Sequence, residues 1–285
     1  MISVLVTGAN GQLGQCLKDV ALNHKDIEWV FKTSKELDIT DPKSIQTLFD
    51  QKNFDYLVNC AAYTAVDKAE SEKEKTFLVN AEAVKYLAET CNANNAVFIH
   101  ISTDFVFDGS KNTAYQEGDK TNPINVYGAS KLKGEQYIQE ILDKYFIIRT
   151  SWVYSEHGHN FVKTMLRLGK ERNEISVVSD QIGSPTYAKD LALLLAEIIE
   201  SQTTAFGLYN YSNEGAISWY DFAKAIFEQS NLDLKVSKTT TENYPTPAKR
   251  PSYSLLDKSK IKKALKLEIP NWKDSLDKVL IKISE

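Results

Sequence analysis

The sequence predicts an α/β fold in which a doubly wound parallel sheet is followed by a smaller C-terminal α/β region. Two observations carry this prediction. Short apolar runs alternate with helical patterns through the first half of the chain, as parallel strands joined by helices require. Beyond about residue 155 the pattern changes to amphipathic helices separated by shorter strand candidates. We therefore expect two parts, residues 1–152 and 153–285, with some segments of the second part returning to the main sheet.

Five apolar runs are the expected strands of the first part. They are rich in β-branched and aromatic residues and nearly continuous in hydrophobicity, which is typical of strands buried on both faces. In order they read "ISVLVTG", "IEWVF", "YLVNCAA", "AVFIHIST" and "YFIIRTS". Helical patterns such as "AEAVKYLAETCNANN" lie between them. Helices are therefore expected on both faces of the sheet.

The second part is expected to contain three amphipathic helices, "NFVKTMLRLGKE", "AKDLALLLAEIIES" and "ISWYDFAKAIFEQS". Asn160 and Ser218 stand where N-caps are expected, because their side-chain oxygens can accept from the free amides of a first helical turn. The strand candidates between the helices are "ISVVSD" and "GLYNYSN", and the proline-bearing stretch "TTTENYPTPAKRPSYSLLD" is expected to be a loop.

Composition limits the possible partners. A quarter of the 285 residues are charged, and the net charge of -4 is spread along the chain without a basic tract, which argues against nucleic acid and membrane surfaces. The N-terminus has no signal-peptide pattern, so a cytoplasmic protein with a small-molecule partner is expected. Cys16, Cys60 and Cys91 form no C-x-x-C pair and are expected to be free thiols.

The first strand ends in "VTGANGQLG", which places Gly8, Gly11 and Gly14 at a strand-to-helix turn. Glycines there allow a tight turn and let backbone amides approach a pyrophosphate at a helix N-terminus. The spacing departs from the usual G-x-G-x-x-G, and a plain turn would also use glycine. The position in the first strand-helix unit, ahead of a second apolar strand, favours a Rossmann-type dinucleotide site.

The end of the second strand bears on which dinucleotide binds. An acidic residue there would accept from a ribose 2′-hydroxyl and repel a 2′-phosphate. In "FKTSKE" no acidic residue occurs until Glu36, whereas Lys32, Ser34 and Lys35 tolerate a phosphate. NADPH is therefore the expected cofactor, with NADH as the alternative.

The stretch "NPINVYGASKLKGEQY" places Tyr127 four residues ahead of Lys131 at an expected helix start after Pro123. The two side chains would share one face of the helix. A half-buried tyrosine covered by a lysine stem is the ordinary interpretation of such a pair. A phenol with a nearby cation can also serve as a proton donor near neutrality, because the cation favours the phenolate.

Taken together and in order, these motifs resemble the extended short-chain dehydrogenase/reductase superfamily over essentially the whole chain. The nucleotide loop "TGANGQLG", the Asp-Ile pair in "LDITD", the segment "NCAAYT", the strand end "ISTDFVFDG" and "YGASK" carry the resemblance. It implies Tyr127, Lys131 and Thr103 as catalytic residues. The cofactor-binding residues that it implies are Gly8, Asn10, Gly11, Gln12, Leu13, Gly14, Asp38, Ile39, Ala61, Ala62, Tyr63, Tyr127 and Lys131.

Within that superfamily the chain is most similar to the dTDP-4-dehydrorhamnose reductase family, on "NCAAYTAVDKAE", "STDFVFDG", "RTSWVY", "NFVKTML", "SDQIGSPTYAKDLA" and "AKRPSYSLLD". The resemblance implies reduction of the C4 ketone of dTDP-4-dehydro-L-rhamnose, with the substrate held by Thr103, Asp104 and Trp152. Arg250 is a candidate for the substrate diphosphate, since a guanidinium matches phosphate geometry, and a solvated loop arginine is the alternative. Some members are magnesium-binding dimers, but no acidic cluster here maps to such a site. The metal and the choice between monomer and homodimer stay open.

Four alternatives are weighed at this stage, and one of them, an epimerase that would share Thr103, Tyr127 and Lys131, is disfavoured because the C-terminal half does not resemble that family. Sugar-nucleotide dehydratases carry Thr-Asp-Glu where this chain has Thr103, Asp104 and Phe105, and a phenyl ring cannot exchange a proton, so dehydration is disfavoured. A reductase of another 4-keto-6-deoxy sugar nucleotide fits the same motifs. A non-catalytic dinucleotide-binding regulatory subunit, as in methionine adenosyltransferase, is disfavoured because the catalytic set is complete.

Overall fold

The computed structural model describes residues 1–284 and has a six-stranded sheet at its centre. The strand order is β10-β5-β4-β3-β1-β2, and every neighbouring pair is parallel. The strands are β1 (Ile2–Thr7), β2 (Ile27–Lys32), β3 (Tyr56–Asn59), β4 (Val97–Thr103), β5 (Tyr145–Thr150) and β10 (Gly207–Asn210). The predicted doubly wound parallel sheet is confirmed, and its first five strands are the five apolar runs.

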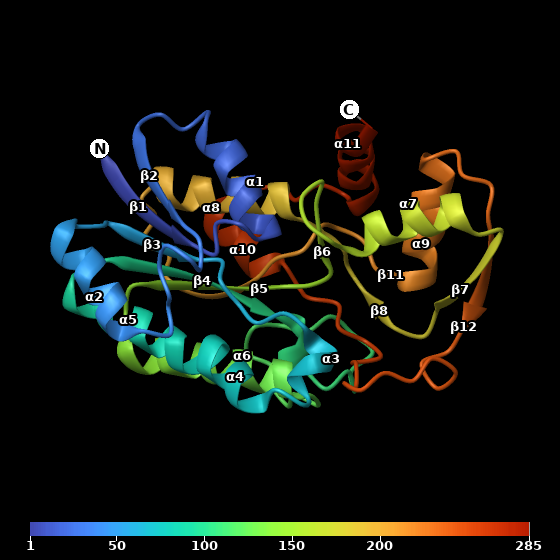
Figure 1. Cartoon of the computed structure of the whole chain (residues 1–285), viewed down its shortest axis with the longest axis horizontal. Helices are drawn as coiled ribbons and strands as arrows, with labels where there is room; N and C mark the ends of the chain where they lie inside the picture. The colour runs from blue at the N-terminus through green and yellow to red at the C-terminus, as the bar shows by residue number, and fades with distance from the viewer. Residues whose placement is uncertain (285) are drawn as a thin grey trace.

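Helices cover both faces of this sheet (Figure 1). One face carries α1 (Gln12–Ala21), α8 (Ala188–Glu200) and α10 (Ser259–Leu265), and the other carries α2 (Pro42–Gln51), α5 (Ala83–Ala93) and α6 (Val126–Ile141). Alternate residues of a strand point to opposite faces, so Val4 and Val6 enter the core under α1 and α8 while Leu5 enters the core under α2 and α5. Burial on both faces explains the continuous hydrophobicity of the strands.

The winding reverses between β1 and β3. Strand β1 pairs with β2 on one side and with β3 on the other, so the chain crosses the sheet in opposite directions on leaving each of the first two strands. In open parallel sheets, ligands bind in the crevice that such a reversal leaves at the carboxyl ends of the strands. The short elements near this end are α3 (Val66–Ala69), α4 (Lys73–Phe77), the π-helical turn η1 (Leu78–Glu82) and the 3₁₀ turn η2 (Asp104–Val106).

The C-terminal region packs around Phe222, which is fully buried in a third hydrophobic core. Its helices are α7 (Phe161–Glu171), α9 (Trp219–Gln229) and α11 (Trp272–Ser284), of which α9 packs against a parallel pair, β7 (Glu174–Val178) with β12 (Lys235–Thr239). The predicted caps are confirmed: Asn160 accepts from the Lys163 amide, and Ser218 forms a capping box with Asp221. Four two-residue strands complete it: β6 (Val153–Tyr154), β8 (Ile182–Gly183), β9 (Thr186–Tyr187) and β11 (Ile217–Ser218).

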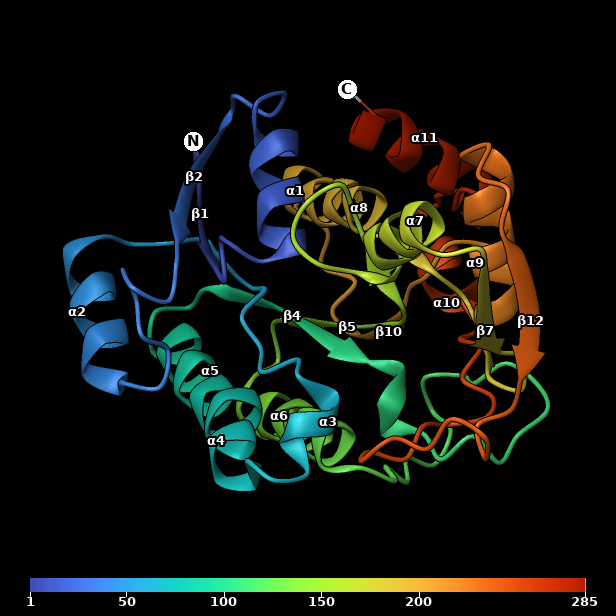
Figure 2. The same ribbon diagram turned by 45° about the vertical axis from the view of Figure 1, so that its right-hand side comes forward.

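Segments from the second half of the chain rejoin the main sheet (Figure 2). Strand β10 pairs with β5 from Gly207 to Asn210, α8 packs against α1, and α10 lies against β10. The C-terminal region is thereby anchored beside the carboxyl ends of the strands. Among residues 1–284, no helix combines the length and hydropathy that crossing a lipid bilayer requires.

Candidate active site

The carboxyl end of β4 places two buried polar side chains at the crevice. Thr103 is 5% exposed and caps η2, because its Oγ1 accepts from the Phe105 amide at 3.1 Å. It also donates to Asp104 Oδ1 at 3.1 Å. Burial raises the pKa of Asp104 to about 6, although hydrogen bonds from Ser254 and Thr103 oppose the rise. Asp104 Oδ2 is buried without a hydrogen-bond partner among residues 1–284, so this carboxyl can bind a further polar group.

Helix α6 begins beside this strand end and carries the tyrosine and lysine. Asn125 is its N-cap and accepts from the Gly128 amide at 2.7 Å. A Cβ on Gly128 would lie 2.1 Å from the carbonyl oxygen of Phe105, so only glycine lets α6 approach η2 this closely. The Phe105 ring meets the Tyr127 ring edge-to-face at 5.9 Å. Thr103, Tyr127 and Lys131 are thus brought to one side of the crevice.

The protonation states of the pair differ from the sequence-based expectation. Lys131 was expected to lower the pKa of Tyr127, but burial raises that pKa to about 12, a hydrogen bond with Thr103 offsetting part of the rise. Burial also lowers the pKa of Lys131 to about 8. The reason lies in the lysine contacts: its Nζ lies 3.0 Å from His100 Nε2 and donates to the Ile101 carbonyl at 2.6 Å. Tyr127 therefore keeps its proton at neutral pH, as a proton donor must.

The glycine loop after β1 has the form that a dinucleotide requires. Gly8 has φ +69°, and a Cβ there would lie 2.5 Å from the Ala61 amide nitrogen, so the turn passes directly over the end of β3. Gly11 is the N-cap of α1 and offers no side chain to its first turn, which leaves the amides there for a ligand. Asn10 is exposed, whereas Leu13 and Gly14 are buried in the helix. These residues fit a pyrophosphate at the start of α1.

The Gln12 side chain has a structural partner that the sequence did not predict. Its Oε1 accepts from Ser155 Oγ at 3.0 Å and from Asn160 Nδ2 at 2.9 Å, which fastens the loop after β6 to the start of α1. His157 Nε2 in the same loop lies 2.8 Å from Asp19 Oδ2 on α1. Asp19, Glu156 and His157 together place two carboxylate oxygens and a ring nitrogen, atoms of the kind that bind metal ions, within 4.8 Å of one another.

The acidic side chains after β2 accept hydrogen bonds within their own turns. The first acidic residue there, Glu36, turns back and accepts from the Thr33 amide and hydroxyl at 2.8 and 2.7 Å. Its carboxylate is therefore occupied within its own turn. Asp38 is exposed and accepts from the Thr40 amide at 2.9 Å, while Ile39 is buried in the core beneath α2.

The segment after β3 borders the opposite side of the glycine loop. Ala61, Ala62 and Tyr63 are partly exposed there. Asn80 holds the segment, because it accepts from the Tyr63 amide at 2.8 Å and donates to the Tyr63 carbonyl at 3.0 Å. It also donates to Ser130 on α6 at 3.0 Å. Asn80 lies in η1, and a π-helical turn is a frequent mark of a functional position.

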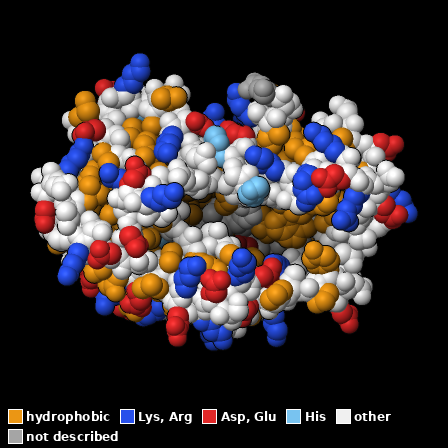
Figure 3. Space-filling model, in the orientation of Figure 1, with side chains coloured by type: hydrophobic (Ala, Val, Ile, Leu, Met, Phe, Trp, Pro, Cys, Tyr) orange, Lys and Arg blue, Asp and Glu red, His pale blue; other side chains and the backbone are white. Residues whose placement is uncertain are grey.

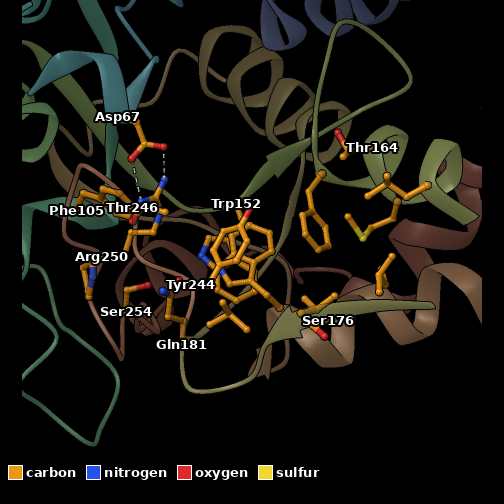
Figure 4. Close-up of a pocket in the computed structure, with 18 of the residues that line it drawn as sticks. Asp67, Phe105, Trp152, Thr164, Ser176, Gln181, Tyr244, Thr246, Arg250 and Ser254 are labelled. Atoms are coloured by element: carbon orange, nitrogen blue, oxygen red, sulfur yellow. Dashed lines mark hydrogen bonds and ion pairs between the residues drawn. The ribbon is translucent and has the colours of Figure 1, made fainter. Parts of the chain in front are cut away.

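A cavity of about 610 Å³ lies between Asp67 and Phe105 on one side and the C-terminal region on the other (Figure 4). Trp152 lies at its centre with φ +48°, a left-handed conformation that is costly for any residue with a side chain, and its ring stacks on Trp219 at 3.7 Å. Hydrophobic side chains gather in this hollow on the surface between α3 and α7 (Figure 3). They include Phe105, Phe161, Met165, Leu168, Ile175 and Val177.

Arg250 lines the same cavity but has a protein partner. Its Nη1 and Nη2 bind Asp67 Oδ1 and Oδ2 at 3.1 and 2.9 Å, so the guanidinium and carboxylate meet as a fork (Figure 4). This pair keeps the pKa of Asp67 below its usual value. Asp67, Asn80 and His100 were not among the predicted site residues. For His100 the sequence did hold a signal, a titratable side chain within the apolar run "AVFIHIST".

Three comparisons agree with this geometry. A family model described as the RmlD substrate binding domain matches residues 2–284. The dTDP-4-dehydrorhamnose reductase of Aggregatibacter actinomycetemcomitans is 42% identical over 290 residues, covering 98% of each chain. A protein of the same name from Escherichia coli strain K12 is 40% identical, over 98% of this chain and 97% of that one.

A solved structure is equally similar. The crystal structure of a dTDP-4-dehydrorhamnose reductase from Bacillus anthracis in complex with NADP superposes with a TM-score of 0.95 at 42% identity. The match covers 99% of this chain and 100% of that chain.

Proposed function

The chain belongs to the family of the RmlD substrate binding domain, and we propose that it catalyses the NADPH-dependent reduction of dTDP-4-dehydro-L-rhamnose to dTDP-L-rhamnose. It is an oxidoreductase, as the family and the near-complete coverage of relatives about 40% identical require. The observation that carries the proposal is a cavity lined by Trp152 and Arg250 whose wall includes Phe105, the residue that packs edge-to-face against Tyr127.

The cofactor would lie along the carboxyl ends of β1 and β3 and supply a hydride to C4 of the sugar. The start of α1 offers backbone amides to the pyrophosphate, and the Lys32–Lys35 turn offers cations to a 2′-phosphate. The residues that would face the cofactor are Gly8, Asn10, Gly11, Gln12, Asp38, Ala61, Ala62 and Tyr63, while the buried Leu13, Gly14 and Ile39 would support them from the core. Gln12 contributes its backbone, since its side chain holds the loop after β6.

The remaining steps belong to the protein side chains. As the C4 oxygen gains negative charge, Tyr127 donates its phenolic proton and Thr103 donates a hydrogen bond to the same oxygen. Lys131 stabilises the tyrosinate that is left. Asp104, with one oxygen unpartnered, accepts from a sugar hydroxyl. Trp152 covers a face of the sugar ring, and Arg250 binds the diphosphate from the mouth of the cavity.

The activity is tested by following the loss of reduced-nicotinamide absorbance when the purified protein meets dTDP-4-dehydro-L-rhamnose, with NADPH and NADH in separate reactions. We expect oxidation, faster with NADPH. Cofactor binding without oxidation of either nucleotide would contradict the substrate assignment. In that case a different 4-keto-6-deoxy sugar nucleotide is the next substrate to assay.

A further inference from the structure

A chain of buried hydrogen bonds runs from β1 across β3 and β4 to the lysine of the active site. Thr7 Oγ1 donates to Asn59 Oδ1 at 2.6 Å, and Asn59 Nδ2 lies 3.1 Å from His100 Nδ1. His100 Nε2 then lies 3.0 Å from Lys131 Nζ. Every member is at most 2% exposed. Each proton in the chain must therefore have an acceptor, because an unsatisfied buried donor is costly.

One backbone amide fixes the direction of the whole chain. The Ala61 N–H can only donate, and it donates to Asn59 Oδ1 at 3.1 Å. The Asn59 carboxamide is thereby oriented with its NH₂ group toward His100. That NH₂ group donates to Nδ1, so Nδ1 must carry the lone pair. Burial holds the pKa of His100 well below its ordinary value, so the ring is neutral and its single proton sits on Nε2.

The Nε2 proton points at Lys131. An ammonium group has only N–H donors, so it would place one of its own protons against the proton on Nε2. An amine has a lone pair that accepts a hydrogen bond from Nε2. An amine also keeps an N–H for the Ile101 carbonyl, which it reaches at 2.6 Å. We propose that His100 is a positioning residue that stabilises Lys131 as an uncharged amine in the ligand-free site at alkaline pH, and that dinucleotide binding under those conditions is coupled to uptake of one proton by Lys131. The second part rests on the proposed function.

The other groups near Lys131 do not oppose this state strongly. Glu135, one helical turn further along α6, favours the ammonium, but its carboxylate is bound by Arg149 at 2.9 and 2.6 Å. Cys60 follows β3, and burial raises the pKa of its thiol to about 12, so it carries no charge near neutrality. His100 on β4, which lies 3.0 Å from Lys131 Nζ, is neutral, and Tyr127 one turn earlier on α6 keeps its proton because burial raises its pKa to about 12.

Proton uptake gives the lysine two positions. With the anionic dinucleotide present, a proton moves from solvent to Lys131 Nζ, and no other bond is made or broken. The ammonium can no longer accept from His100 and turns toward the crevice, where it favours the tyrosinate form of Tyr127. The high pKa of Tyr127 in the ligand-free structure therefore falls only when the site is filled.

The histidine tautomer is measured on ligand-free protein labelled with ¹⁵N in its histidine rings, by long-range ¹H–¹⁵N spectra. The chain has four histidines, and His100 is identified by the loss of its signals in His100→Gln. At about pH 9, where Lys131 is uncharged, we expect a neutral ring with the proton on Nε2, since the folded-state pKa of His100 is depressed. A proton on Nδ1, or a doubly protonated ring, would overturn the proposal. This spectrum needs no turnover, so it stands apart from the reductase assignment.

Proton uptake is measured by calorimetry of NADP⁺ binding at about pH 9, in two buffers with different ionisation enthalpies, where phosphate groups of second pKa near 6 are already ionised. We expect close to one proton taken up per site, and none in Lys131→Met. His100→Phe, which removes the donor, should take up less, and His100→Gln, which places an amide donor near the Nε2 position, should restore part of it. Equal uptake by the wild type and Lys131→Met would contradict the coupling.

Discussion

Arg250 and Asp67 join the two halves of the molecule across the mouth of the cavity, although 183 residues separate them in sequence. The carboxylate comes from α3, beside the dinucleotide site, and the guanidinium comes from the loop after β12. Both guanidinium NH₂ groups face the carboxylate, and Nη1 also contacts Thr246. A substrate diphosphate would thus meet a guanidinium already oriented by a partner.

Replacing Arg250 by Ala should raise the KM for the sugar nucleotide by about tenfold or more, because a hydrogen bond to a charged group contributes roughly 1.5–3 kcal/mol. Asp67→Asn keeps the cation and should have a smaller effect on KM. The measurement is steady-state kinetics at saturating NADPH, with thermal unfolding of both variants as the control. If both variants lose the same stability and neither changes the KM, the pair has only a structural role.

Tyr127→Phe should reduce kcat by roughly 10²–10⁴-fold, the usual contribution of a positioned proton donor, while leaving NADPH affinity unchanged. The substitution removes one hydroxyl and keeps the ring that packs edge-to-face on Phe105. Turnover and cofactor binding are measured separately on the same preparation. Retained turnover would show that another group supplies the proton.

Trp152→Ala should raise the KM for the sugar nucleotide and leave the dissociation constant of NADPH unchanged. The ring stacks on Trp219 at the centre of the cavity, away from the glycine loop. Trp219→Ala removes the ring on which Trp152 stacks and is the matched comparison. It should also raise the KM for the sugar nucleotide, but by a smaller factor. Weakened cofactor binding in Trp152→Ala would instead indicate a general loss of structure.

Asp104 should make the protein less stable as pH rises through the range from about 4 to 6. Its folded-state pKa of about 6 lies above the value of 3.8 expected when unfolded, so its contribution to stability is complete below pH 3.8 and is lost as pH rises through about 6. Two pKa units correspond to about 3 kcal/mol. Chemical unfolding of the wild type and Asp104→Asn at pH 4 and 7 measures the difference. A gap independent of pH would contradict the raised pKa.

The strands and helices could be predicted because their signals are local. Each of the first five strands is a continuous apolar run, and the caps Asn160 and Ser218 precede amphipathic helices. The start of α6 was expected at Tyr127 and lies one residue earlier, after the Asn125 cap. This one-residue difference does not affect the pair. Pro123 and the helical pattern after it were sufficient to place Tyr127 and Lys131 on one helix.

The contacts that set protonation could not be predicted, because they depend on tertiary positions. His100 reads as one polar residue in a buried strand until Asn59 and Lys131 are seen on either side of its ring. Arg250 was expected to be available for a diphosphate, and nothing near it in sequence indicates Asp67. The expectation that Lys131 lowers the pKa of Tyr127 was wrong for the ligand-free protein. The spacing of two residues on a helix does not reveal where the lysine side chain points.

The place of β10 has a consequence for how the chain is made. Strand β5 has no neighbour on its outer side until β10 (residues 207–210) has been synthesised, more than fifty residues after β5 ends. A nascent chain that ends before this point presents an unpaired strand edge, which can pair with other chains and aggregate. The C-terminal region therefore completes the sheet as well as the pocket, and a truncated first half would be a poor candidate for independent folding.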